Sequence, residues 1–153
     1  MNIEYGVATL EELPRIVEIK VAMFEEAGHA DLLADHAESI VLRDYQQLYL
    51  ESTAIHFVAR DKGQIVASVG AFIKSDLPFR YFSPATYGFI GDVFTENAYR
   101  GRGISTMLNS EALIWLKDNG VVMVRLLASD AGRPIYERLG FRATDEMVLI
   151  LET

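Results

Sequence analysis

The stretch Arg100-Gly101-Arg102-Gly103-Ile104-Ser105 decides the fold, and it lies between a strand-like run at 88–95 and a helix-like run at 104–119. Two glycines let the backbone approach a ligand without interference from a Cβ atom. The helix that follows presents unpaired N–H groups and the positive end of its dipole at its start. The arginines add donors that pair with phosphate oxygens. Together these features predict a binding loop for a pyrophosphate.

Two common phosphate-binding motifs do not fit this loop. A P-loop needs G-x-x-x-x-G-K-[ST], and no lysine follows a glycine at that spacing. A dinucleotide-binding turn needs G-x-G-x-x-G, but Thr106 occupies the position of the third glycine. That turn also needs an acidic residue at the end of the next strand, and the run 121–128 contains none. For the six residues alone, a basic surface loop without a ligand stays the alternative.

The loop resembles the acyl-CoA turn of the GCN5-related N-acetyltransferases (GNAT), written [RQ]-x-x-G-x-[GA], through Arg100, Gly103 and Ser105. Serine at the last position departs mildly from glycine or alanine and keeps the side chain small. Downstream, Ile-Tyr-Glu-Arg-Leu-Gly-Phe at 135–141 resembles the L-Y-x-x-x-G-F motif of the same family, at about its usual distance from the loop. Residues 5–14 resemble the opening strand and helix of the family, so the resemblance covers nearly all of the chain.

The resemblance implies an α/β (α+β) domain over residues 1–153, with the acyl-CoA N-acyltransferase fold. A mixed central sheet of about six or seven strands would have helices on both faces. The run 121–128 is apolar almost throughout, as expected of a central strand covered on both faces. Strands are expected at 3–8, 54–60, 64–73, 89–95, 121–128 and 147–151, and helices at about 12–27, 34–50, 104–119 and 133–139.

Asp61-Lys62-Gly63 is expected to be a tight turn that joins its flanking strands into a hairpin. Thr9 and Glu12 resemble a capping box, but Pro14 would break a helix begun at Thr9, so the regular helix is expected to start near Glu12. The buried stripe expected for the helix 104–119 consists of Met107, Leu108, Ala112, Trp115 and Leu116.

The family's cosubstrate is acetyl-CoA, and the resemblance implies that it binds where the strands ending at Thr95 and Ala128 diverge. The unpaired backbone of Val93, Phe94 and Thr95 would then pair with the amides of pantetheine, as an added strand does. The remaining residues expected to hold the cosubstrate are Arg100, Gly101, Arg102, Gly103, Ile104, Ser105, Ser129 and Arg133. Because the net charge is −8, the three arginines should gather locally at the phosphates.

Attack of an amine on a thioester needs a proton acceptor, an oxyanion donor and an acid. An alkyl amine of pKa about 10.4 is mostly protonated at pH 7, so an acidic side chain or a water chain must remove its proton. Asp92, in an otherwise apolar strand, is the candidate base, and a solvated or ion-paired aspartate is the alternative. A backbone N–H of Phe94 or Thr95 is the expected oxyanion donor. Lesser candidates for the base are Glu96, Glu25 and Glu26.

Tyr136 occupies the place of the general acid in the resembling motif. A phenol with a pKa near about 10 is protonated at neutral pH, so it could protonate the leaving thiolate and be reloaded from solvent. Alternatively, Tyr136 is an aromatic residue that packs the last helix on the sheet.

Composition excludes several other kinds of chemistry and partner. The absence of cysteine excludes disulfides, thiolate metal sites and an acyl-cysteine intermediate. Direct transfer of the acetyl group in a ternary complex is therefore expected. A chain without cysteine also agrees with a cytoplasmic location, which is the expected one. His29, His36 and His56 share no metal-ligand spacing, so no metal is expected, and each is interpreted as a surface or partly buried histidine. The charge of −8 argues against nucleic acid. No apolar run approaches the roughly 20 residues that span a bilayer, so no membrane partner is expected.

The amine acceptor is the part of the reaction that the sequence specifies least. A primary amine of a small molecule or peptide is expected, bound by the first two helices, their connection and the segment 75–86. There Phe79, Tyr81 and Phe82 could line a wall, or instead pack the loop or form the contact of a homodimer. The acidic surplus favours a cationic acceptor, or serves solubility alone. The competing function is a non-catalytic module of the same fold that holds acyl-CoA as a sensor or assembly subunit.

Overall fold

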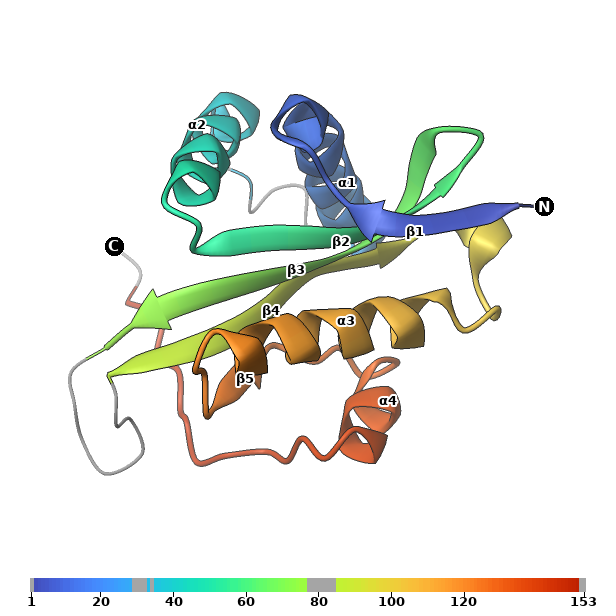
Figure 1. The fold of residues 1–153 in the computed structure, drawn as a ribbon. Coiled ribbons are helices and arrows are strands. Elements are labelled where there is room, and N and C mark those ends of the chain that lie inside the picture. The colour runs from blue at the N-terminus through green and yellow to red at the C-terminus, as the bar shows by residue number, and fades with distance from the viewer. Residues whose placement is uncertain (1, 29–32, 34, 77–84, 152–153) are drawn as a thin grey trace.

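A five-stranded sheet with helices on both faces forms the body of the protein in a computed structural model that describes residues 2–28, 33, 35–76 and 85–151. The strands, in spatial order, are β1 (Ile3–Val7), β2 (Ala54–Asp61), β3 (Gln64–Ser75), β4 (Thr86–Thr95) and β5 (Val124–Leu126). The helices are α1 (Leu13–Glu26), α2 (Ala37–Leu50), α3 (Ile104–Asp118) and α4 (Arg133–Arg138), with 3-10 turns η1 (Leu10–Glu12) and η3 (Asn97–Tyr99). Helices α1 and α2 cover one face and α3 the other (Figure 1).

The predicted fold class is confirmed, but among the described residues the sheet has five strands and not six or seven. Of the central strand expected at 121–128, only the three residues of β5 are a strand, and β5 lies at the edge of the sheet. Val122 and Leu127, on either side of β5, are 70% and 85% exposed. The strand expected at 147–151 is also wrong, because those residues have no strand pairing. A continuous apolar run predicts a strand that needs cover on both faces, but it does not tell which neighbours supply that cover.

At the start of α1, the capping pair Thr9 and Glu12 and the helix-breaking Pro14 indicate different first residues for the helix. Thr9 and Glu12 form the predicted capping interaction, in which the Thr9 N–H donates to the Glu12 carboxylate at 2.9 Å. That interaction belongs to η1, and the regular helix begins afterwards at Leu13, with Pro14 in its first turn. Proline is tolerated there because its missing N–H has no partner in a first turn.

The strands from β1 to β4 each pair antiparallel with the next one, whereas β5 pairs parallel with β4. The turn between β2 and β3 has Lys62 and Gly63 at φ 52° and 78°. This left-handed pair is typical of a two-residue hairpin turn and confirms the predicted hairpin. In the described residues, no helix is long and apolar enough to cross a membrane.

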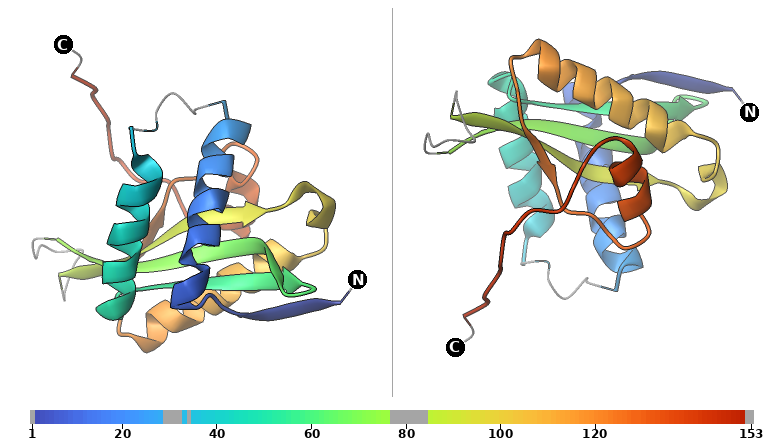
Figure 2. Two further views of the ribbon diagram at one scale, coloured as in Figure 1. Left: turned by 90° about the horizontal axis from the view of Figure 1, so that it is seen from above. Right: turned by 90° about the horizontal axis from the view of Figure 1, so that it is seen from below.

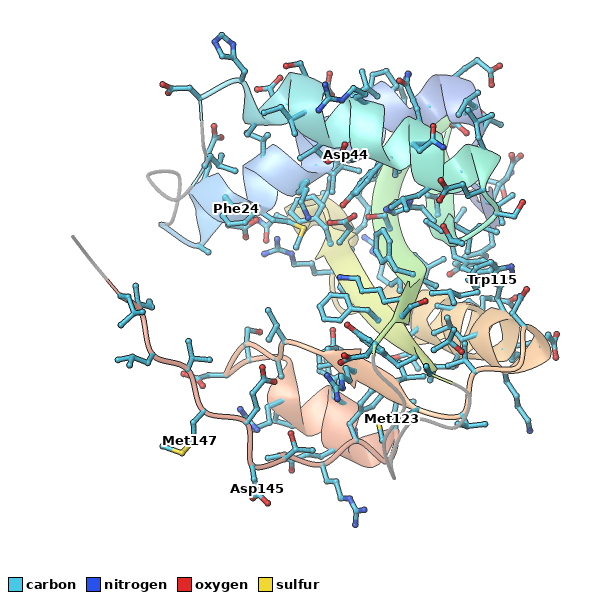
Figure 3. All side chains as sticks on the ribbon, turned by 90° about the vertical axis from the view of Figure 1, so that its left-hand side faces the viewer. Phe24, Asp44, Trp115, Met123, Asp145 and Met147 are labelled. Atoms are coloured by element: carbon cyan, nitrogen blue, oxygen red, sulfur yellow. The ribbon has the colours of Figure 1, made fainter. Side chains whose placement is uncertain are left out.

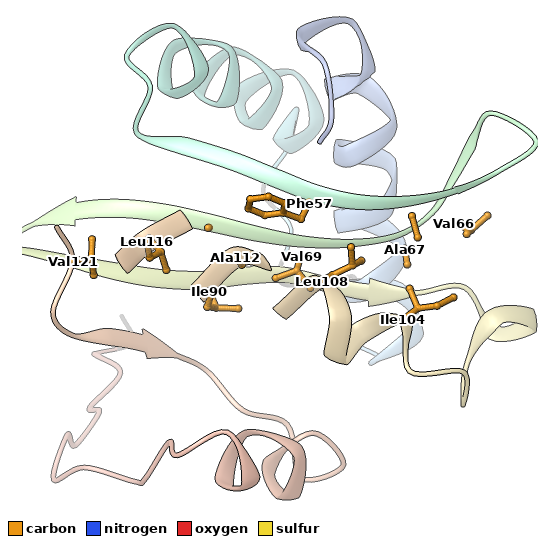
Figure 4. Packing of buried hydrophobic residues seen from close by; sticks show 12 residues of the cluster. Phe57, Val66, Ala67, Val69, Ile90, Ile104, Leu108, Ala112, Leu116 and Val121 are labelled. Atoms are coloured by element: carbon orange, nitrogen blue, oxygen red, sulfur yellow. The ribbon is translucent and has the colours of Figure 1, made fainter. Parts of the chain in front are cut away.

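Helix α3 packs on the sheet through residues spaced one turn apart (Figure 4). Ile104, Leu108, Ala112 and Leu116 are all buried. Met107, which was expected in the same stripe, is 45% exposed, and Trp115 is only partly buried. The buried residues recur every four positions along one face of the helix. Met107 does not belong to that series, so its side chain lies beside the buried face and is partly exposed.

We expect Leu116→Ala to lower the free energy of unfolding by about 2–5 kcal/mol, because it leaves a cavity in a fully buried position. Urea denaturation followed by circular dichroism measures the loss. Met107→Ala on the same helix is the matched control and should change the free energy by about 0.5 kcal/mol or less. Equal losses in the two variants would contradict this packing of α3.

Candidate functional site

A β-bulge interrupts β4 at Asp92. Gly91 pairs with Gly70 of β3, and Phe94 pairs with Ser68, so β4 has one residue more than β3 between these pairs. Asp92 has φ 52°, in the left-handed region that aspartate tolerates better than most residues. The Ser68 hydroxyl donates to the Asp92 carbonyl at 2.7 Å and so holds the bulge from β3.

Beyond the middle of β4, the strands β4 and β5 part. Their pairing covers only Gly88 to Ile90 against Val124 to Leu126. Among the described residues, no strand pairs with β4 on that side from 91 to 95. The divergence predicted from the sequence is therefore present, with the second strand ending at Leu126 and not at Ala128.

Thr95 has its backbone polar groups on this open edge. The Glu96 N–H donates to the Val66 carbonyl on β3 at 2.9 Å. Backbone groups alternate in direction along a strand, so the N–H of Thr95 points away from β3 and that of Phe94 toward it. Arg100 Nε bonds the Thr95 carbonyl at 2.8 Å, as expected for a group on the outer side. Of the two predicted oxyanion donors, the geometry favours Thr95.

The glycine loop is open on the side where a ligand would lie. Gly101 and Gly103 have φ 77° and 78°, and a Cβ at either position would meet nothing within 4 Å. Gly103 is the N-cap of α3 and supplies no side-chain cap, so the first N–H groups of the helix are available to an anion. Ile104 has a buried side chain and offers only its backbone there. These observations fit the pyrophosphate of a coenzyme A molecule.

Arg100 also links the loop to α1. Its guanidinium lies 2.7 Å from the Glu26 carboxylate, and both side chains are about half exposed. Such an exposed pair contributes little to stability, so the guanidinium stays available to a phosphate. Arg102 makes a long contact of 3.4 Å with the Ala98 carbonyl, and Arg133 begins α4. Their gathering at the phosphates stays a prediction.

The Asp92 side chain lies at the centre of a buried polar cluster that draws on four elements. Lys20 Nζ on α1 lies 2.8 Å from Oδ1, and the Tyr45 hydroxyl on α2 donates to Oδ2 at 2.7 Å. His56 Nε2 on β2 lies 2.8 Å from Oδ2, and donates because a carboxylate only accepts. Tyr49 bonds the other ring nitrogen of His56 at 2.7 Å. We call these five residues the Asp92 cluster.

Electrostatics keep Asp92 ionised. Burial by itself would raise the pKa of Asp92, but the hydrogen bond with His56 and the ammonium of Lys20 outweigh it, so the pKa lies below its usual value. Burial raises the pKa of the Tyr45 and Tyr49 hydroxyls, which therefore remain protonated donors. A carboxylate of low pKa is a weak proton acceptor. Of the alternative interpretation of Asp92, the solvated part is wrong and the ion-paired part is confirmed, because the carboxylate is buried and pairs with Lys20. Its role as base stays an untested prediction.

Sequence reasoning missed the partners of Asp92. His56 was interpreted as a surface or partly buried histidine, whereas it is fully buried. A usable signal was its place in a strand whose other residues are almost all apolar, where an imidazole needs a buried partner. The contributions of Lys20, Tyr45 and Tyr49 depend on how α1 and α2 lie over the sheet, and no local pattern reports that arrangement.

Tyr136 lies in α4, half buried, with its ring edge-on to Phe141 at a centroid distance of 5.9 Å. Burial raises its pKa, so the phenol is protonated at neutral pH. The Ser129 hydroxyl accepts the Gly132 N–H at 3.1 Å, which shapes the turn before α4. This geometry agrees with both interpretations of Tyr136, as an acid and as a packing residue.

The expected acceptor side is only partly described. Helices α1 and α2 lie over the face of the sheet to which the Asp92 side chain points (Figure 2). Phe79, Tyr81 and Phe82, which were expected to line an acceptor wall, lie outside the described residues, as does His29.

We expect Asp92→Asn to lower the free energy of unfolding at pH 7 by about 2–4 kcal/mol, because it removes a buried charge that its partners surround. The folded-state pKa of Asp92 lies below its ordinary value of 3.8. Its stabilisation is therefore complete above about pH 5 and is lost as the pH falls further. Urea titrations from pH 7 to pH 3 should show the gap between wild type and variant narrowing.

Asp44→Asn on the exposed surface of α2 is the matched control, with little change at any of these pH values. A gap between wild type and Asp92→Asn that stays constant down to pH 3 would contradict an ionised Asp92 of lowered pKa.

Comparisons with known proteins point to one family. The sequence model described as "Acetyltransferase (GNAT) family" matches residues 13–141. An aminoglycoside N(6')-acetyltransferase type 1 of Acinetobacter haemolyticus is 27% identical over 121 residues, which are 73% of this chain and 79% of that protein. A glucosamine 6-phosphate N-acetyltransferase of Trypanosoma brucei brucei is 26% identical over 143 residues, 87% of this chain and 95% of that protein.

A solved structure shares the fold. It is a predicted acetyltransferase with acetyl-CoA from Clostridium acetobutylicum, with a TM-score of 0.87 at 22% identity, and the match covers 98% of this chain and 96% of that one.

Proposed function

The chain belongs to the acetyltransferase (GNAT) family, and from this we propose that it moves an acetyl group from acetyl-CoA to the primary amine of a small molecule by direct attack. The observation that carries the proposal is the open edge of β4 beside the glycine loop at the start of α3. The first supplies backbone groups for an extended ligand, and the second supplies N–H groups for a pyrophosphate. One cosubstrate that contains both parts is acetyl-CoA.

Bound acetyl-CoA supplies an activated thioester, and the residues of the chain orient it. The N–H groups at the start of α3 and the Arg100 guanidinium would hold the phosphates. The outward N–H of Thr95 would stabilise negative charge as it develops on the thioester oxygen, since a donor held by the strand needs no reorganisation. The bulge at Asp92 sets the direction of that N–H.

Proton transfer would divide between two groups. The Tyr136 phenol, protonated at neutral pH, would protonate the leaving thiolate. For the amine, we propose that Asp92 acts as a positioning residue, which holds the bulge of β4 and with it the direction of the Thr95 N–H, and that the proton leaves through water. A carboxylate whose pKa is held low by His56 and Lys20 is a weak proton acceptor, and the Lys20 ammonium already balances its charge.

Amino sugars are the acceptor class that we propose first. The two relatives are named for an aminoglycoside and for glucosamine 6-phosphate, which both carry a primary amine on a sugar ring. The net charge of −8 favours the polycationic aminoglycoside over the anionic sugar phosphate, because an acidic surface attracts cations. The competing function is a module that binds acyl-CoA without turnover, and it predicts that no amine releases CoA.

A thiol-release assay with acetyl-CoA tests the proposal. The panel contains aminoglycosides, glucosamine 6-phosphate, a polyamine, amino acids and a peptide with a free N-terminus. We expect free CoA to appear with an amino sugar and the acetylated product to be found by mass spectrometry. Binding of acetyl-CoA without CoA release on any amine would support the binding module and contradict the enzyme.

We expect Gly103→Ala to raise the dissociation constant for acetyl-CoA about tenfold, or about 1.4 kcal/mol, because a Cβ at this φ enters the space left for the phosphates. Isothermal titration calorimetry measures the constant. Gly120→Ala is the matched control, because Gly120 has φ 82° and an equally open Cβ position but follows the other end of α3. Equal affinity in the two variants would place the phosphates elsewhere.

We expect Tyr136→Phe to lower kcat by roughly 10- to 1,000-fold, the usual range for loss of one acid or base, while acetyl-CoA affinity stays nearly unchanged. The variant keeps the ring and its contact with Phe141. Tyr5→Phe on the exposed surface of β1 serves as control. If kcat of Tyr136→Phe stays within twofold of wild type, Tyr136 has a packing role and water protonates the thiolate.

A further inference from the structure

The core of the protein does little to hold helix α4, although α4 carries Tyr136. The helix has six residues, and none of them is buried. In Figure 3 it lies at the opposite end of the molecule from α2, which carries the labelled Asp44. A general acid must keep its proton within hydrogen-bond reach of the reacting atom. The direction of the Tyr136 ring therefore depends on contacts within its own segment of the chain.

Gly132, the residue before α4, leaves a space that the Tyr136 ring fills. Its φ of −82° and ψ of −23° are right-handed values that most residues adopt. A Cβ at this position would lie 3.2 Å from Tyr136 Cε2 and 3.2 Å from Ser129 Oγ. Since carbon atoms in contact lie about 3.5–4.0 Å apart, even an alanine would push the ring. The glycine is therefore needed here for its size and not for its backbone conformation.

Two hydrogen bonds to Ser129 fix the turn in which Gly132 lies. The Ser129 hydroxyl accepts the Gly132 N–H at 3.1 Å, and the Ser129 carbonyl accepts the Arg133 N–H at 2.9 Å. The Gly132 carbonyl in turn accepts the Tyr136 N–H at 3.2 Å. These bonds join the turn to the backbone of the tyrosine, so the bare backbone at Gly132 keeps its place beside the ring.

Phe141 is the second fixed neighbour of the Tyr136 ring. At the end of α4, Gly140 has φ 101°, and the Phe141 N–H donates to the Tyr136 carbonyl at 3.0 Å, so the chain turns back toward the helix. The Phe141 ring lies edge-on to that of Tyr136, with an interplanar angle of 73°. The turn before α4 and the turn after it thus both contact the same ring, and together they restrict its rotation.

We propose that Gly132 is a positioning residue for the Tyr136 phenol. The bare backbone at Gly132, held by the Ser129 hydroxyl, lets the ring take the direction from which it protonates the leaving thiolate. This role rests on the proposed function, in which Tyr136 is the acid. The amine forms the new C–N bond and loses its proton to water, and the C–S bond breaks with its electron pair on sulfur. The phenol proton then moves to that sulfur, and solvent returns a proton to the phenolate.

Gly132→Ala is the first test, with the amine of the panel that releases CoA fastest as acceptor. We expect kcat to fall about threefold to tenfold, because the displaced ring no longer aims its hydroxyl. The KM for the acceptor and the Kd for acetyl-CoA should stay within about twofold. Gly6→Ala on β1 is the matched control, because a Cβ there would meet only the end of the Arg60 side chain. Its kcat should equal that of wild type, and circular dichroism should show that both variants fold.

A double-mutant cycle decides whether Gly132 acts through the phenol. Tyr136→Phe keeps the ring, and with it the steric conflict, but has no proton to give. If Gly132 acts by aiming the acid, Gly132→Ala should change kcat by less than about twofold when Tyr136→Phe is already present. An equal loss of kcat in both backgrounds, or wild-type kcat in Gly132→Ala alone, would overturn the proposal.

Nuclear Overhauser contacts test the geometry without an acceptor. In wild type we expect contacts between the Gly132 α-protons and the Tyr136 ring protons, and their absence would overturn the proposal. Failure of the proposed function gives a different result, in which Tyr136→Phe keeps the kcat of wild type although these contacts are present. That result would contradict the acid and the positioning role together. A lowered kcat in Tyr136→Phe with an unchanged kcat in Gly132→Ala would contradict the positioning role alone.

Discussion

The extra residue in β4 is the constraint on which the rest of the site depends. Asp92 occupies a left-handed conformation at the bulge, and its carboxylate is bonded to Lys20, Tyr45 and His56. These bonds join α1, α2 and β2 to β4 through one buried charge. Loss of the Asp92 carboxylate would leave its partners unpaired in the core, and loss of the partners would leave a buried charge unpaired. The cluster and the bulge therefore stabilise each other. The bulge lies just beyond the last residue of β4 that pairs with β5, so it begins the part of β4 that has an open edge.

The same cluster changes the role assigned to the most obvious acidic side chain. A sequence pattern shows a carboxylate near the reaction centre, and a carboxylate near an amine suggests a base. The surrounding donors instead hold Asp92 ionised. We propose that the Asp92 side chain helps to fix the backbone direction of β4 beside the thioester, and that the proton of the amine leaves through water.

The sequence predicted the parts that depend on local geometry. Gly101 and Gly103 before α3, the hairpin at Lys62 and Gly63, and the capping interaction of Glu12 depend on neighbours a few residues away, and all three were found. The Asp92 cluster was not predictable, because its members lie up to 72 residues apart in the chain. The apolar run at 121–128 was assigned to a central strand and the run at 147–151 to the final strand of the sheet. Both assignments were wrong, because composition reports a need for burial and not the partner that meets it.

Amide hydrogen exchange of β4, read by NMR with and without acetyl-CoA, tests the central claim most directly. We expect the Thr95 amide to exchange fast in the free protein and to become protected when acetyl-CoA pairs with the open edge. The Glu96 amide, already bonded to Val66, should be protected in both states. Protection of Thr95 in the free protein, or no change in Thr95 exchange on saturation with acetyl-CoA, would contradict an edge of β4 held open for the cosubstrate.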